Sequence, residues 1–156
     1  MPENIEYLIK LVFFIVGICG IVYSIFNILF SINARAWPKI VGFIDYCDIE
    51  EEFDSDGDIN YKAVISYSYE YRGIKYTSNR VGYGLLSSNM KFMIDSAYHK
   101  AIKNYPKAFI KVNPKKPKIV TLLTGLHTYH IVTLLFFIVF MCVAYYFLIM
   151  LSNESF

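Results

Sequence analysis

The sequence predicts a membrane protein of α+β class. Two transmembrane helices flank a small antiparallel β domain, a barrel or sandwich of about five strands with one inserted helix. Two apolar runs, Leu11–Phe30 and Ile131–Leu151, contain no charged residue. At about 1.5 Å per residue, each forms a helix of roughly 30 Å, which matches the hydrocarbon core of a bilayer. The segment between them is polar and rich in tyrosine, and part of it alternates as strands do.

These runs divide the chain into five segments. They are an N-terminal segment at 1–10, a first transmembrane helix at 11–31, a β-rich domain at 32–127, a second transmembrane helix at 128–151 and a C-terminal tail at 152–156. The first run is too long for a cleaved signal peptide, whose apolar core is about 7–15 residues after a basic start. We therefore expect a retained anchor.

The first helix is followed by Trp37 and Pro38. A tryptophan just beyond a spanning helix is typically placed among the lipid headgroups, so Trp37 is a candidate membrane-interface anchor. Pro38 prevents the helix from continuing. The β-branched and aromatic residues of Ile40–Cys47 predict a first strand, and an acidic stretch from Asp48 to Asn60 follows it.

The strongest strand signal is Tyr61–Tyr71, in which large residues occupy every second position. Two interpretations of this stripe stay open. It is one buried face of a sheet, or its tyrosines Tyr67, Tyr69 and Tyr71 form a partner surface, because tyrosine supplies a large, rigid contact area.

The remaining elements follow from local signals. Arg72 and Gly73 predict a hairpin turn into a strand at Ile74–Tyr83. Apolar residues at spacings of three and four predict a helix at Leu85–Asn104. The last two strands are expected at Ala108–Val112 and Ile119–Leu123.

Positive charge near the helix ends predicts the orientation. Six basic residues flank the helices on the side of the domain and only Lys10 lies on the other side, which places the domain in the cytoplasm and both termini outside. Four of the six form a cluster: Lys111, Lys115, Lys116 and Lys118. This cluster either contacts anionic lipid headgroups or only sets the topology, and both interpretations stay open.

The sequence offers no catalytic or cofactor motif, so we expect no enzyme activity, cofactor or resident metal. The acidic residues around Gly57 imitate a calcium loop, but Ala63 stands where a bidentate glutamate is required, which favours a solvated turn. His127 and His130 share a helix face but lack the further ligands that zinc needs. A net charge of +2 does not indicate a nucleic-acid partner.

Several segments together resemble the domain of unknown function 3592 family. They are Trp37-Pro38 followed by Gly42-Phe43-Ile44, the run from Tyr61-Lys62-Ala63-Val64 to Ile74-Lys75-Tyr76, Tyr105-Pro106, and Asn113-Pro114-Lys115-Lys116-Pro117. The resemblance covers roughly residues 36 to 125 and departs at Ala108, where many members carry a glycine. It implies a bacterial inner-membrane protein with a small β domain between two spanning helices, and it transfers no catalytic residue.

Two functions are therefore considered. The leading hypothesis is a non-enzymatic integral membrane protein whose β domain binds a protein partner at the membrane surface. The alternative is an immunity protein that neutralises a membrane-acting toxin, because some members of the family that this chain resembles are encoded beside toxins.

Overall fold

The computed structural model describes the backbone of residues 3–154 and the side chains of residues 5, 8–147 and 149. Residues 1, 2, 155 and 156 of the predicted terminal segments lie outside the described residues. The chain forms two compact units. One contains the described residues up to Asn27 and from His130 onward, and the other contains residues 28–129.

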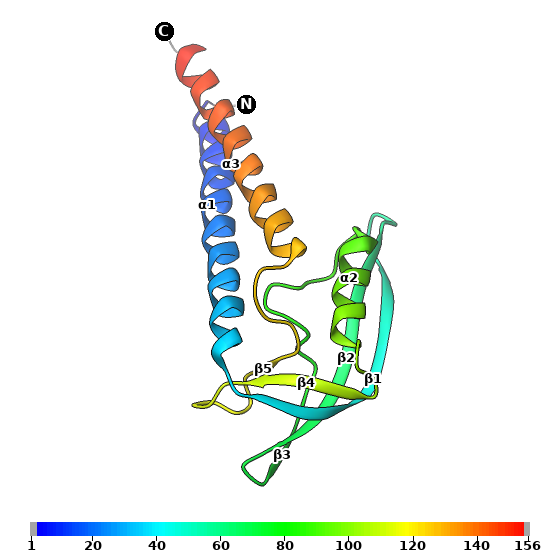
Figure 1. The fold of residues 1–156 in the computed structure, drawn as a ribbon. Helices are drawn as coiled ribbons and strands as arrows, with labels where there is room; N and C mark the ends of the chain where they lie inside the picture. Colours follow the sequence, from blue (N-terminus) through cyan, green and yellow to red (C-terminus); the bar gives the residue numbers. More distant parts are fainter. Residues whose placement is uncertain (1–2, 155–156) are drawn as a thin grey trace. The chain divides into compact units, whose positions relative to one another are not determined.

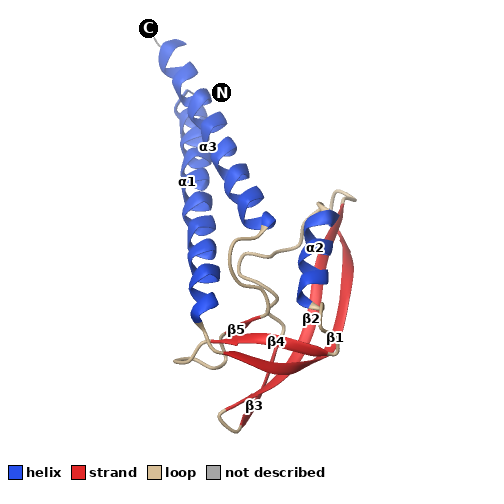
Figure 2. Cartoon of the chain, viewed as in Figure 1, coloured by secondary structure: helices blue, strands red, loops and turns tan. Residues whose placement is uncertain are grey.

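The first unit is a pair of long apolar helices, α1 (Glu3–Asn33) and α3 (Thr128–Glu154), which pack together. Figures 1 and 2 show both helices as continuous elements. They are longer than the predicted apolar runs because polar residues extend both ends. Among the described residues, two apolar spans are long enough to cross a membrane: Leu8–Ala36, with mean hydropathy 2.4, and Thr128–Phe147, with mean hydropathy 2.2.

Glycines in α1 allow the two helices to approach closely. A Cβ atom on Gly20 would collide with the Phe137 ring, and one on Gly17 would lie 3.1 Å from the Cβ of Met141. The rings of Phe13 and Phe140 add a contact with centroids 5.9 Å apart. The glycines therefore serve the packing of α1 against α3.

The second unit contains a five-stranded antiparallel sheet. The strands are β1 (Lys39–Phe53), β2 (Ile59–Tyr71), β3 (Ile74–Ser78), β4 (Lys107–Val112) and β5 (Val120–Thr121). Their spatial order is β3-β2-β1-β4-β5. The predicted fold class is confirmed: two apolar helices accompany a five-stranded antiparallel sheet with one inserted helix. The sheet is open, with β3 and β5 at its edges.

Strand β1 is much longer than the predicted strand, because it continues through the acidic stretch to Phe53. It pairs with β2 from Gly42↔Tyr69 to Phe53↔Ile59, with one irregularity between Ile44 and Tyr46. The acidic residues have low strand propensity, but the backbone ladder to β2 overrides it. Figure 1 shows the result, a long curved arm formed by β1 and β2.

The first part of β1 lies between two strands. Gly42 pairs with Tyr69 on β2 and with Ala108 on β4. A Cβ atom at this position would collide with the Ser68 carbonyl oxygen. Glycine at this position therefore lets the backbones approach closely where the sheet curves.

The inserted helix α2 (Lys91–Ala101) packs on β2 and β1, and Figure 2 shows it along the inner side of the arm. It begins later than predicted because Ser88 forms two backbone hydrogen bonds with Tyr61, of 2.8 and 2.9 Å, which hold the preceding segment in a β-bridge. Its buried face joins the sheet residues in one core. The buried residues include Ile44, Ile65, Tyr67, Tyr69, Met93, Ile94, Ala97, Ala108, Ile110, Val112 and Val120.

A short 3₁₀ turn, η1 (Ala34–Ala36), follows α1 and leads into the sheet. Beside it, the buried Ser31 hydroxyl donates to the Gly125 carbonyl oxygen at 2.8 Å. The Gly125 N–H in turn donates to the Ser31 carbonyl oxygen at 2.9 Å. These two bonds join the first and last parts of the domain.

Candidate interaction surface

The outer face of the sheet carries an exposed apolar cluster of Val41, Phe43 and Phe109. Side chains alternate along β1 and β4, so Gly42, Ile44, Ala108 and Ile110 are buried on the inner face. The cluster residues point the other way and are 52%, 56% and 38% exposed. Val41 lies directly opposite Phe109 across the two strands. This outer-face cluster is therefore a contiguous apolar surface on both strands.

Two lysines flank the outer-face cluster. The Lys39 ammonium lies 3.7 Å from the centroid of the Phe109 ring, a cation–π contact. Lys107 is exposed and pairs with Phe43 across the same two strands. An exposed apolar centre with a charged rim is the arrangement typical of a protein interaction surface.

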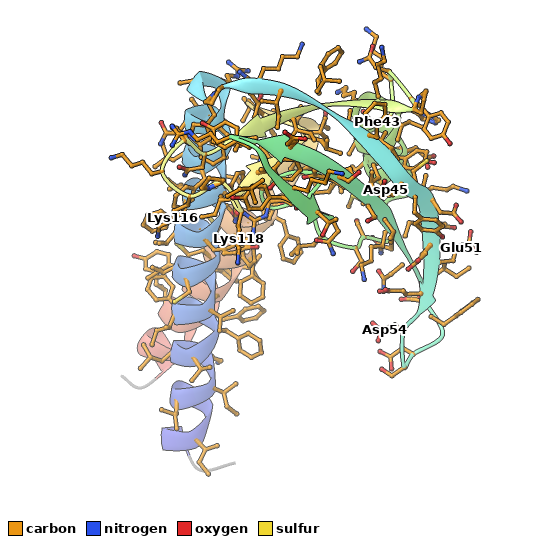
Figure 3. The ribbon with its side chains drawn as sticks, turned by 90° about the horizontal axis from the view of Figure 1, so that it is seen from below. Phe43, Asp45, Glu51, Asp54, Lys116 and Lys118 are labelled. Atoms are coloured by element: carbon orange, nitrogen blue, oxygen red, sulfur yellow. The ribbon has the colours of Figure 1, made fainter. Side chains whose placement is uncertain are left out.

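The arm formed by β1 and β2 is strongly acidic. The acidic residues of β1 and of the turn that follows it are Asp45, Asp48, Glu50, Glu51, Glu52, Asp54, Asp56 and Asp58. Glu52 forms an ion pair with Lys62 at 2.9 Å, and hydrogen bonding to Glu52 raises the pKa of Lys62. Figure 3 shows Asp45, Glu51 and Asp54 along the arm, on the opposite side of the domain from Lys116 and Lys118.

Backbone hydrogen bonds close the hairpin turn of the arm. The Asp54 N–H donates to the Asp58 carbonyl oxygen, and the Gly57 N–H donates to the Asp54 carbonyl oxygen, both at 2.9 Å. Within the described residues, no group of three or more His, Cys, Asp or Glu side chains is arranged to hold a metal ion. That the turn is solvated and binds no metal stays a prediction.

The tyrosine stripe of β2 belongs mainly to the core. Tyr67 is 0% and Tyr69 is 4% exposed, whereas Tyr71 is half-buried. The Tyr67 hydroxyl donates to the Arg80 carbonyl oxygen, and the Tyr69 hydroxyl donates to the Pro117 carbonyl oxygen, both at 2.8 Å. Burial raises the pKa of both phenols. The alternative of a partner surface is wrong for Tyr67 and Tyr69, because their side chains are covered.

The four lysines of the predicted basic cluster do not act as one set. Lys111 is half-buried on β4, and its ammonium donates to the carbonyl oxygens of Arg35 and Trp37 at 2.8 Å each. It therefore stabilises the end of η1, a role that differs from the predicted headgroup contact. Lys115, Lys116 and Lys118 are exposed in the turn between β4 and β5 and remain candidates for anionic lipid.

The turn that carries these three lysines is well ordered by hydrogen bonds. The Asn113 N–H donates to the Ile119 carbonyl oxygen at 2.9 Å. The side-chain oxygen of Asn113 accepts from the backbone N–H groups of Lys115 and Lys116, at 2.9 and 3.2 Å. The lysine side chains extend outward, as Figure 3 shows for Lys116 and Lys118.

Trp37 is half-buried in an aromatic group that follows the apolar span of α1. Its ring meets Tyr83 edge-on at 6.4 Å, and Tyr83 stacks on Phe30 at 5.8 Å. The Arg80 guanidinium lies 5.1 Å from the Tyr83 ring. Aromatic rings beside a cation, next to an apolar span, are suited to a membrane interface. The anchoring role of Trp37 stays a prediction.

The outer-face cluster was not identified from the sequence. Its signal was present, because Val41 and Phe43 alternate with Gly42 and Ile44 in the first predicted strand. Phe109, however, joins them only through the pairing of β1 with β4, which links residues more than sixty positions apart.

No family model, curated protein or solved structure matches this chain. The function must therefore be inferred from the residues themselves.

Proposed function

We propose that this chain is a two-pass membrane protein whose β domain binds a protein partner at the membrane surface and catalyses no reaction. The proposal has a membrane part and a binding part. The observation that carries the binding part is the outer-face cluster of Val41, Phe43 and Phe109.

The membrane part is supported by the exposure of the two apolar spans. Each span contains an apolar stretch of 18 residues. Only 17% of this stretch in the first span and 11% in the second is buried within the structure. The core helix of a soluble protein would hide most of such a surface. Phe13 and Phe136, for example, are 51% and 62% exposed. Leaving one large apolar side chain in water costs roughly 1.5–3 kcal/mol, so lipid is the solvent that suits these helices.

The binding part is supported by the position of the outer-face cluster on rigid strands. Aromatic side chains on a sheet supply contact area with little loss of conformational entropy when a partner covers them. The rim lysines, Lys39 and Lys107, can supply polar contacts around the apolar centre. The partner is proposed to be a protein, because alternating apolar and charged side chains on a sheet face suit an interface of that kind.

The proposal also includes the orientation of the domain relative to the membrane, which follows from the positions of the basic residues. The domain lies in the cytoplasm of a bacterial cell and both termini lie outside the inner membrane, because basic residues lie mainly on the side of the domain. Arg35 lies at the end of the first apolar span and Lys39 follows it, and the exposed lysines of the β4–β5 turn add to the same side.

Site-specific photocrosslinking in living cells tests the binding proposal. A photoreactive residue replaces Phe43, and the same residue at the exposed Tyr105 serves as the control site. We expect a discrete protein adduct from position 43 whose yield falls at least about tenfold when Phe109→Glu is added. An adduct that is equally abundant from both sites, or unchanged by Phe109→Glu in a folded protein, would contradict the proposal.

The identity of the adduct also separates the two hypotheses about the partner. The immunity alternative rests on the resemblance alone. It gains support only if the adduct contains a membrane-acting toxin and Phe109→Glu removes protection of the cells from that toxin.

A further inference from the structure

We propose that the free edge of the β1 arm, residues 47–53, accepts a basic, extended segment of a partner protein as an additional β-strand. This inference rests on the proposed function, because it specifies the chemistry of a protein partner. It concerns a surface that is different from the outer-face cluster.

The first observation is an unpaired strand edge. Strand β1 pairs with β4 only over Lys39–Phe43, whereas its pairing with β2 continues to Phe53. The last backbone bond on the β4 side joins the Ile44 N–H to the Pro106 carbonyl oxygen at 2.9 Å. Among the described residues, no strand pairs with that side of β1 beyond this point. Figure 1 shows the arm with β1 along its outer margin.

The hydrogen-bond pattern identifies which backbone groups lie on the free edge. The bond between Asp54 and Asp58 closes the hairpin. Bonds between antiparallel strands recur at every second residue. Asp48, Glu50 and Glu52 therefore bond to β2. The intervening residues direct their N–H and C=O groups to the free edge, and they are Cys47, Ile49, Glu51 and Phe53.

A side chain of the arm already occupies one of these edge groups. The Ile49 N–H donates to the Asp48 carboxylate at 2.7 Å. This bond agrees with the assignment of Ile49 to the free edge. A carbonyl oxygen of an added strand would replace the carboxylate on that N–H, and the released carboxylate could pair with a cation of the partner.

The second observation is the charge pattern, which selects the partner. On one face of the arm, Asp48, Glu50 and Glu52 occupy alternate positions. On the other face lie Cys47, Ile49 and Phe53, with Glu51 as the exception. Side chains directly opposite each other on adjacent strands are about 4.5–5.5 Å apart and interact. A strand that alternates basic and apolar residues would therefore match both faces.

The same pattern disfavours a second copy of this chain at this edge. Two β1 arms that paired edge to edge would place like charges opposite one another, which is destabilising. Charged edges are a common protection against such self-association. The acidic edge thus disfavours pairing with the β1 edge of a second copy of this chain and favours a basic strand.

The test uses the full chain in a non-ionic detergent and a synthetic peptide of eight residues in which lysine and valine alternate. Eight residues span about 26 Å, enough to cover the free edge. Binding is measured by fluorescence anisotropy at low salt. We expect saturable binding that a glutamate–valine peptide does not show and that weakens at least about tenfold when every peptide nitrogen is methylated, because methylation keeps the charge but removes the backbone donors.

Hydrogen exchange locates the peptide. Bound peptide should slow exchange at the amides of Cys47, Ile49, Glu51 and Phe53, because these lie on the free edge. Exchange at the amides of Asp48, Glu50 and Glu52 should change little, because β2 already protects them. Protection of other segments in place of this alternating set would overturn the inference.

Matched variants test the role of charge. Glu50→Gln combined with Glu51→Gln should weaken binding roughly tenfold, which is about 1.4 kcal/mol. Glu70→Gln, at an exposed position near the end of β2 that is remote from the hairpin turn, should leave binding unchanged. Equal binding of the methylated peptide, or no binding of the lysine peptide to the folded wild type, would refute strand addition. Either result would leave the adduct at position 43 unaffected, so a failure here is distinct from a failure of the proposed function.

Discussion

Replacement of Tyr67 by phenylalanine should destabilise the domain measurably at neutral pH. The ring stays in the core, but the Arg80 carbonyl oxygen loses the hydroxyl that donates to it at 2.8 Å. A part-buried acceptor left without its donor costs about 1–2 kcal/mol, the lower part of the range for buried groups. For a loss of about 1–2 kcal/mol, we expect the Tm of the domain to fall by roughly 4–16 °C.

The dependence on pH gives this prediction a second signature. Burial raises the pKa of Tyr67 far above 10.0, its value in an unfolded chain. Above pH 10 the unfolded state loses this proton and the folded state keeps it, so the stability of the wild type falls as pH rises. At pH 11 this one group lowers the free energy of unfolding of the wild type by about 1.4 kcal/mol. Tyr67→Phe has no phenol at this position, so its stability does not fall for this reason.

Thermal melting of the full chain in detergent, followed by tyrosine absorbance at pH 8 and pH 11, measures both effects. The variant should melt well below the wild type at pH 8 and close to it at pH 11. Tyr105→Phe is the control, because Tyr105 is 63% exposed and a surface change usually costs less than about 0.5 kcal/mol. A Tyr67→Phe protein that melts with the wild type at both values of pH would refute the assignment of Tyr67 to the core.

Three further predictions concern the helices, the lysines and the topology. Gly20→Leu should separate α1 from α3 at a cost of about 1–3 kcal/mol, because it collides with Phe137, and faster hydrogen exchange in α3 would reveal this. Lys111→Met should lower the Tm of the domain, because it removes two hydrogen bonds at the end of η1, whereas Lys116→Met should leave the Tm unchanged. Equal Tm values for the two variants would contradict the distinct role of Lys111. In a cysteine-free background, Ser55→Cys should resist an impermeant maleimide in intact cells and react after lysis, and labelling of intact cells would reverse the proposed orientation.

The sequence was most informative where a pattern is local. The apolar runs predicted both long helices, and the alternation around Tyr67 predicted a strand and offered burial of its tyrosine face as one of two interpretations. These signals depend on residues a few positions apart, so they can be recognised without the fold.

The sequence was less informative where a distant partner decides the structure. The acidic residues after Cys47 read as a loop, but the ladder to β2 makes them a strand. Lys111 read as one of four solvated lysines, but it binds carbonyl groups of residues 74 and 76 positions earlier in the chain. The free edge of β1 is likewise defined by where β4 ends, and no local pattern marks that point.

The paired hydrogen bonds between Ser31 and Gly125 have a mechanical consequence. They join two residues 94 positions apart, so the segments through which the chain enters and leaves the domain are hydrogen-bonded to each other. Tension that draws the two ends of the domain apart must first break these two bonds, of 2.8 and 2.9 Å, before it reaches the ladders of the sheet. The two bonds therefore shield the ladders of the sheet from small forces applied at the ends of the domain, and Ser31→Ala, which removes the hydroxyl bond, would leave only the Gly125 backbone bond in that role.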